Sequence, residues 1–101
     1  MKGRELDSII RDESKLKDVL IIDVRPEEQF ANGHIEHSIN IPTSKILDRI
    51  EELEEYREKH IILYCNTGRN SAKAYNILKE EGFNNISDAE GVKQYSYNLI
   101  K

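Results

Sequence analysis

The sequence is poor in several residue types, and each shortage excludes a class of protein. Tryptophan is missing, proline occurs twice, and cysteine occurs once among 101 residues. One cysteine cannot form a disulfide within the chain, a CxxC redox pair or a zinc knuckle. No run of apolar residues is long enough to span a bilayer, so we expect no membrane partner. The net charge of −4 argues against a nucleic-acid partner bound through its phosphates.

The residues that are present are typical of a well-solvated domain. Apolar residues make up 38% of the chain and charged residues 34%. This length can enclose one modest core, so we expect a single domain over residues 1–101. Residues 1–7 are charged, but no apolar segment of the signal-peptide kind follows them, and the expected location is therefore the cytoplasm.

Two aliphatic runs predict strands that are buried on both faces of a parallel sheet, Val19–Val24 and Ile61–Tyr64. Weaker patterns predict short strands at 38–41 and 85–87. Helices are expected at 6–11, at 27–31, from Thr43 or Ser44 onward with an apolar face that reaches Tyr56, at 71–81 and at 92–99. Strands that alternate with helices indicate an α/β fold around a mostly parallel sheet of about four to five short strands.

Cys65 has the most informative setting in the chain. It ends the second aliphatic run and opens a polar loop, residues 66–70, which leads into the helix expected from Ser71. A strand, a short loop and a helix start gather backbone N–H groups and the positive end of the helix dipole around one sulfur. Such surroundings stabilise a thiolate, so Cys65 is predicted to be a nucleophile rather than an inert buried thiol.

Two segments match the pattern of a known family. The first consists of Asp23-Val24-Arg25-Pro26, Phe30, Gly33-His34-Ile35 and Ser38-Ile39-Asn40-Ile41-Pro42. The second is Tyr64-Cys65-Asn66-Thr67-Gly68-Arg69-Asn70-Ser71-Ala72, followed by Leu78 and Gly82-Phe83. Together they resemble the rhodanese homology domain, in the form of the single-domain thiosulfate sulfurtransferases. The resemblance covers residues 19–92 and implies a three-layer α/β fold, with helices on both faces of the sheet.

The resemblance implies a sulfurtransferase that works through a cysteine persulfide. Cys65 would take sulfur from a small anionic donor such as thiosulfate and release sulfite. A thiol, cyanide or a protein acceptor would then collect the sulfur, because the chain has no second cysteine. The residues expected to bind the donor, through backbone amides and one guanidinium, are Asn66, Thr67, Gly68, Arg69, Asn70 and Ser71. No cofactor is implied.

Three further polar residues are expected to support the site structurally. Asp23 and Arg25 stand at the end of a predicted strand, where a carboxylate paired with an arginine commonly orders neighbouring loops. His34 is expected in a turn with its ring hydrogen-bonded. His34 and His37, even with Cys65, lack the ligand pattern of a metal site, so we expect no metal.

Two other functions remain open. One is a non-catalytic sulfur carrier or regulatory rhodanese module, and the other is a phosphatase or arsenate reductase. Those related enzymes carry arginine six positions after the cysteine, whereas here Arg69 is at the fourth position and Ser71 at the sixth. The six-residue loop 65–70 therefore favours sulfur over a phosphoryl group. Near the chain end, Gly91 and Tyr95 stand where the family has its motif GG-x-x-x-W, with one glycine missing.

Overall fold

The two aliphatic runs form the centre of the sheet in the computed structural model, which describes residues 1–101. Strand β1 (Val19–Asp23) pairs in parallel with β4 (His60–Tyr64), and Ile22 lies opposite Leu63. Strand β3 (Ile39–Asn40) pairs with β1, and β5 (Ile86–Asp88) pairs with β4, both in parallel. The strand order β3-β1-β4-β5 confirms the predicted mostly parallel sheet.

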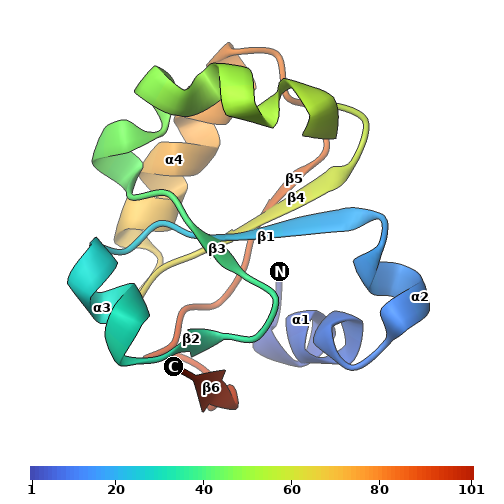
Figure 1. Cartoon of the computed structure of the whole chain (residues 1–101), viewed down its shortest axis with the longest axis vertical. Coiled ribbons are helices and arrows are strands. Elements are labelled where there is room, and N and C mark those ends of the chain that lie inside the picture. The colour runs from blue at the N-terminus through green and yellow to red at the C-terminus, as the bar shows by residue number, and fades with distance from the viewer.

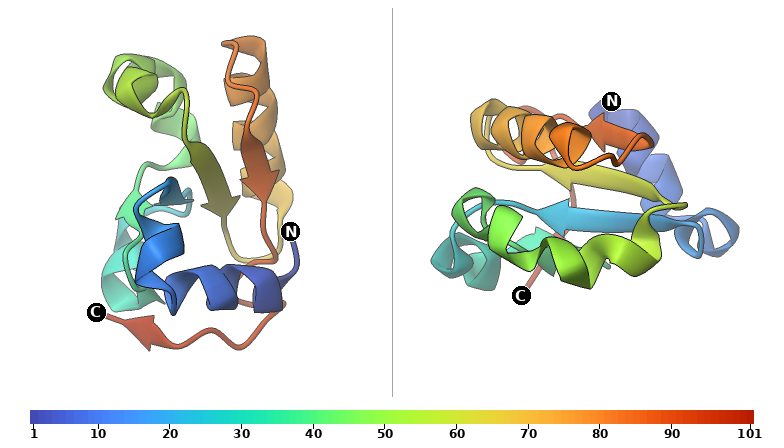
Figure 2. Two further views of the ribbon diagram at one scale, coloured as in Figure 1. Left: turned by 90° about the vertical axis from the view of Figure 1, so that its right-hand side faces the viewer. Right: turned by 90° about the horizontal axis from the view of Figure 1, so that it is seen from above.

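Each central strand sends alternate side chains into two separate cores, because neighbouring residues of a strand point to opposite faces. One core holds Ile22 and Leu63 under helix α4 (Arg69–Glu80) and the 3-10 segments η1 (Thr43–Lys45) and η2 (Leu47–Tyr56). The other core holds Ile21, Ile62 and Tyr64 with Leu6 of helix α1 (Gly3–Ile10). Figures 1 and 2 show these helices on the two sides of the sheet, which gives three layers.

The smaller elements lie around this sandwich. Helix α2 (Glu13–Leu16) begins at Asp12, whose carboxylate accepts the N–H of Ser14 at 3.0 Å. Helix α3 (Glu27–Asn32) follows β1, with Pro26 as its N-cap residue. Strands β2 (His34–Ile35) and β6 (Leu99–Ile100) form a separate antiparallel pair, which the sequence did not predict. In Figure 1 this pair lies on the same side of the sheet as α1. None of the helices has the length and apolar character needed to cross a membrane.

Three predicted helices are confirmed with small changes of boundary, namely α1, α3 and α4. The α-helix expected from Thr43 is wrong, because η1 and η2 are 3-10 helices with a non-helical residue, Arg49, between turns. Acidic residues recur in this segment at spacings of three and four, which would place like charges side by side on an α-helix and destabilise it. The two ion pairs of η2, Arg49–Glu52 and Arg57–Glu54, are both spaced by three, which suits the 3-10 geometry.

The helix expected at 92–99 is also wrong. The chain instead makes a turn over residues 92–95 and ends in β6. The N–H groups of Val92 and Lys93 donate to the carbonyls of Cys65 and Asn66, at 2.9 and 3.0 Å. These contacts to the loop after β4 tie the start of the segment to the site, and β6 then pairs with β2.

Candidate active site

Cys65 lies at the carboxyl end of β4, between that strand and α4. The chain turns at Gly68, whose φ of 92° is a left-handed conformation that glycine adopts without steric cost. Helix α4 then begins at Arg69. We call residues 65–70 the cysteine loop. The positive end of the α4 dipole therefore faces the sulfur.

Three polar groups of the protein contact Sγ of Cys65. The N–H of Gly68 donates to it at 3.0 Å, and the N–H of Ser71 donates at 3.4 Å. The hydroxyl oxygen of Ser71 also lies 3.4 Å from the sulfur. That hydroxyl is 3.2 Å from the carbonyl of Gly68 as well, so its proton can turn to the sulfur when a thiolate forms.

Burial and hydrogen bonding act in opposite directions on the Cys65 thiol. Cys65 is only 2% exposed, and burial by itself raises the pKa of its thiol. The Ser71 hydroxyl and the N–H groups of Ser71, Gly68 and Asn70 favour the anion, and together they hold the pKa of Cys65 below the ordinary cysteine value. The site therefore favours an enclosed thiolate, which is a good nucleophile for a small reactant.

The side chains of the cysteine loop are arranged differently from its amides. The Arg69 side chain is exposed and makes no hydrogen bond or ion pair. The Asn66 side chain donates to Oε1 of Gln29 at 2.8 Å. The carbonyl of Asn70 accepts the Thr43 hydroxyl at 3.1 Å, and Thr67 is exposed. The structure thus brings backbone amides to Sγ but leaves the Arg69 guanidinium free at the rim.

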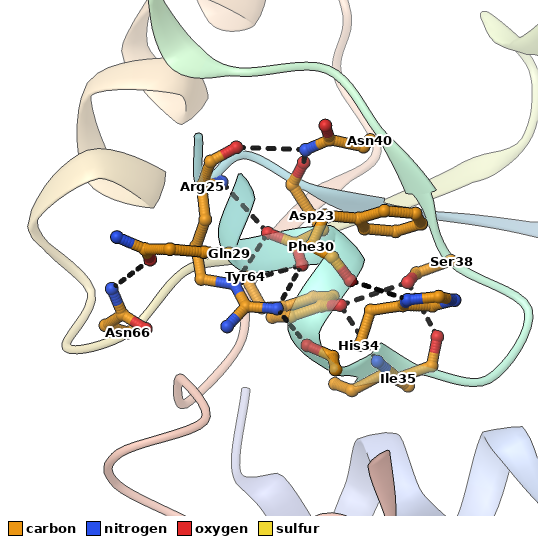
Figure 3. A network of polar contacts seen from close by, with 11 residues as sticks. Asp23, Arg25, Gln29, Phe30, His34, Ile35, Ser38, Asn40, Tyr64 and Asn66 are labelled. Atoms are coloured by element: carbon orange, nitrogen blue, oxygen red, sulfur yellow. Dashed lines mark hydrogen bonds and ion pairs between the residues drawn. The ribbon is translucent and has the colours of Figure 1, made fainter. Parts of the chain in front are cut away.

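Asp23 and Arg25 form a buried ion pair beside the cysteine loop (Figure 3). The Arg25 guanidinium donates to both carboxylate oxygens of Asp23 at distances between 2.7 and 3.0 Å. Its Nη2 also donates to the carbonyl of Gly33 at 2.6 Å. The pair joins the end of β1 to the turn before β2, and neither residue is hydrogen-bonded to the sulfur.

Other polar groups of Figure 3 fix the turn between α3 and β3. The ring of His34 stacks on Phe30 with centroids 3.8 Å apart, and its Nδ1 donates to the carbonyl of Phe30 at 2.9 Å. The hydroxyl of Tyr64 accepts the N–H of Ile35 and contacts the Ser38 hydroxyl, both at 3.0 Å. No three side chains of the kinds that ligate metals come together.

Sequence reasoning missed two glutamines and the reason for one glycine. Gln29 and Gln94 both contact the cysteine loop, one through Asn66 and the other through the carbonyl of Thr67 at 3.0 Å. A Cβ on Gly91 would lie 2.2 Å from the carbonyl oxygen of Asn66, so only glycine allows this close approach. Gly91, the one glycine kept from the family motif GG-x-x-x-W, was the only feature of the sequence that indicated a contact between this segment and the site.

Comparison with known proteins decides the family. The model of the rhodanese-like domain matches residues 4–95. The chain belongs to the rhodanese-like family. The chain is similar to the thiosulfate sulfurtransferase PspE of Escherichia coli, with 35% identity over 79% of this chain and 77% of that protein.

Other relatives show the domain in different settings. The tRNA uridine(34) hydroxylase of Citrobacter koseri is 30% identical over 90% of this chain, which corresponds to only 26% of the hydroxylase. Among solved structures, a rhodanese with anions from E. coli superimposes with a TM-score of 0.74 and 34% identity, over 82% of this chain and 98% of that one. A rhodanese-related protein from Thermoplasma volcanium gives 0.79 and 29%, over 99% and 95% of the two chains. The predicted rhodanese fold is confirmed.

Proposed function

We propose that this protein is a sulfurtransferase that moves sulfane sulfur from thiosulfate, or a similar small donor, through a persulfide on Cys65. The observation that carries the proposal is the pair of amides, from Gly68 and Ser71, that donate to Sγ. Donors fixed in this way stabilise negative charge on the sulfur before and after it reacts. The likeness to PspE, a thiosulfate sulfurtransferase, supports the same reaction class.

The reaction has two balanced steps. The Cys65 thiolate attacks the outer sulfur of thiosulfate, a new S–S bond forms, and the bond to the sulfonate sulfur breaks as sulfite leaves with its electron pair. The persulfide anion keeps the charge of the thiolate and stays within reach of the loop amides. A thiol, cyanide or protein nucleophile then attacks the terminal sulfur and returns Cys65 to the thiolate.

The donor is proposed to bind at residues 66–71. Their backbone amides lie at the start of α4, where an anion is favoured. Arg69, exposed and unpaired at the rim, offers a forked donor to a sulfonate oxygen. A related E. coli structure is that of a rhodanese with anions, which is consistent with this chemistry. Asp23, Arg25 and His34 are proposed to hold the surrounding turns.

Intact mass measures the first step directly. The protein is incubated with thiosulfate, freed of excess donor and weighed by mass spectrometry. We expect a gain of one sulfur atom that cyanide removes as thiocyanate, and no gain in Cys65→Ala. An equal gain in the variant, or none in the wild type, would refute the persulfide on Cys65.

The sulfur-carrier alternative is favoured by one comparison. The match to about a quarter of a tRNA hydroxylase shows that this domain also occurs as part of larger proteins. Slow turnover of thiosulfate and cyanide, together with efficient loading by a cysteine desulfurase, would indicate a carrier.

A cytoplasmic location stays a prediction, which fractionation of cells expressing a tagged chain would test.

A further inference from the structure

Three carbonyl groups of the cysteine loop are held by a segment that lies more than twenty residues later in the chain. The N–H of Val92 donates to the carbonyl of Cys65, and the N–H of Lys93 donates to that of Asn66. The next carbonyl, that of Thr67, accepts Nε2 of Gln94 at 3.0 Å. Three consecutive carbonyls of the loop are thus each bound by one donor of residues 92–94.

The third of these contacts fixes the amide that donates to the sulfur. The carbonyl of Thr67 and the N–H of Gly68 belong to the same peptide unit, which is planar with the two groups on opposite sides. Holding the carbonyl outward therefore directs the N–H of Gly68 inward, where it lies 3.0 Å from Sγ of Cys65. Because Gly68 has no Cβ, it offers no side chain that would hinder rotation of this peptide unit.

The Gln94 side chain is itself held in place. Its Oε1 accepts the N–H of Gly91 at 2.7 Å, while its Nε2 donates to Thr67. Val92 and Lys93 act through backbone N–H groups, which substitution leaves unchanged. Gln94 acts through its side chain and is exposed, so it can be replaced without opening the core.

We propose that Gln94 is a positioning residue that keeps the Thr67–Gly68 peptide turned toward the sulfur of Cys65. Its side-chain amide bonds to Gly91 and Thr67 and not to the sulfur, and it acts through the Gly68 amide. The inference deepens the proposed function, since it concerns the same nucleophile, but the orientation of the peptide does not depend on which reactant Cys65 attacks.

Alkylation of Cys65 by iodoacetamide over a range of pH tests the role without any sulfur donor. Gln94→Met keeps the length of the side chain and removes both amide contacts. We expect the pH profile to move to higher pH, with a rate on its low-pH side that is about two- to fivefold lower. The high-pH plateau should match the wild type, because the free thiolate is unchanged. The melting temperature should change little, since Gln94 is exposed.

Gln29→Met is the matched control. It makes the same chemical change in a residue that contacts the same loop, but through the Asn66 side chain instead of a backbone carbonyl. We expect its profile to superimpose on that of the wild type. Gln94→Glu keeps an acceptor for Gly91 and loses the donor to Thr67, so it should shift in the same direction as Gln94→Met, and it carries the test if the methionine variant does not fold.

The outcomes separate this role from the proposed function. Unchanged profiles in both Gln94 variants, or an equal shift in Gln29→Met, would overturn the positioning role even if Cys65 takes up sulfur normally. Conversely, a shifted profile in a protein whose Cys65 gains no sulfur from thiosulfate would leave the role of Gln94 intact and refute only the proposed reaction.

Discussion

Replacing Asp23 with asparagine should cost this protein a large part of its stability. The Asp23 side chain is fully buried, and the Arg25 side chain is only 6% exposed. The carboxylate accepts the Arg25 backbone N–H at 2.9 Å as well as the guanidinium. Asp23→Asn keeps the shape of the side chain but leaves a buried guanidinium without a counter-ion, which costs about 3–5 kcal/mol.

That loss is a sizeable fraction of the total for a domain of this length, which is about 5–15 kcal/mol. It should lower the melting temperature by about 12 °C or more. Urea unfolding followed by far-UV circular dichroism measures the free energy, since the chain has no tryptophan to follow. Asp7→Asn is the matched control: its partner Arg11 is 75% exposed, and we expect a loss below about 0.5 kcal/mol.

A double variant separates a structural role from a chemical one. Asp23→Leu with Arg25→Met removes both buried charges, so it should be more stable than Asp23→Asn. The folded double variant should still gain sulfur on Cys65, because neither residue of the pair is hydrogen-bonded to Sγ. A loss below about 1 kcal/mol in Asp23→Asn would refute the claim that this pair holds the end of β1. A folded double variant that gains no sulfur would assign the pair to the chemistry.

Three further results are expected. Arg69→Ala should weaken thiosulfate use about tenfold or more, measured as kcat/KM, with no change in unfolding free energy, because the side chain is exposed and unpaired; comparable losses in both would make Arg69 structural. Gly91→Ala should cost about 1–3 kcal/mol in thermal unfolding, since the new Cβ would meet the Asn66 carbonyl, and an unchanged melting temperature would contradict this. Because the pKa of Cys65 is lowered in the folded state, the folded protein loses the thiol proton at a lower pH than the unfolded chain does. Relative to Cys65→Ser, the wild type should therefore gain free energy of unfolding as the pH rises from the folded-state pKa toward the ordinary value near 9.0. Parallel curves of unfolding free energy against pH would show that the thiolate is not stabilised.

The immediate setting of Cys65 could be predicted because it depends on adjacent residues. The aliphatic run before Cys65 makes β4, and a loop containing Gly68 leads directly into α4. A strand that ends where a helix begins places the amides of the helix start close to one sulfur. The two buried strands could be predicted for the same reason, because β1 and β4 are near-continuous runs of aliphatic residues.

The two wrongly predicted helices show that the local spacing of apolar residues does not determine the backbone conformation of every segment. The apolar spacing of Ile46, Ile50 and Leu53 suits an α-helix, but acidic neighbours and ion pairs spaced by three accompany a 3-10 helix there. The segment from Val92 gives its first N–H groups to carbonyls of the cysteine loop, so it turns instead of coiling. Neither outcome follows from periodicity alone.

The sequence by itself therefore determined the strand, loop and helix that surround Cys65, the central strands of the sheet that carries it and the family to which the chain belongs. Only the tertiary structure decided how the loop around Cys65 is held. Gln29 and Gln94 reach that loop across 37 and 27 residues of chain, and the Asp23–Arg25 pair is seen to be buried only once the chain is folded. The physical reason is range: a strand, a turn and a helix start are set by neighbours in sequence, whereas the direction of one peptide unit is set by a donor from a distant segment.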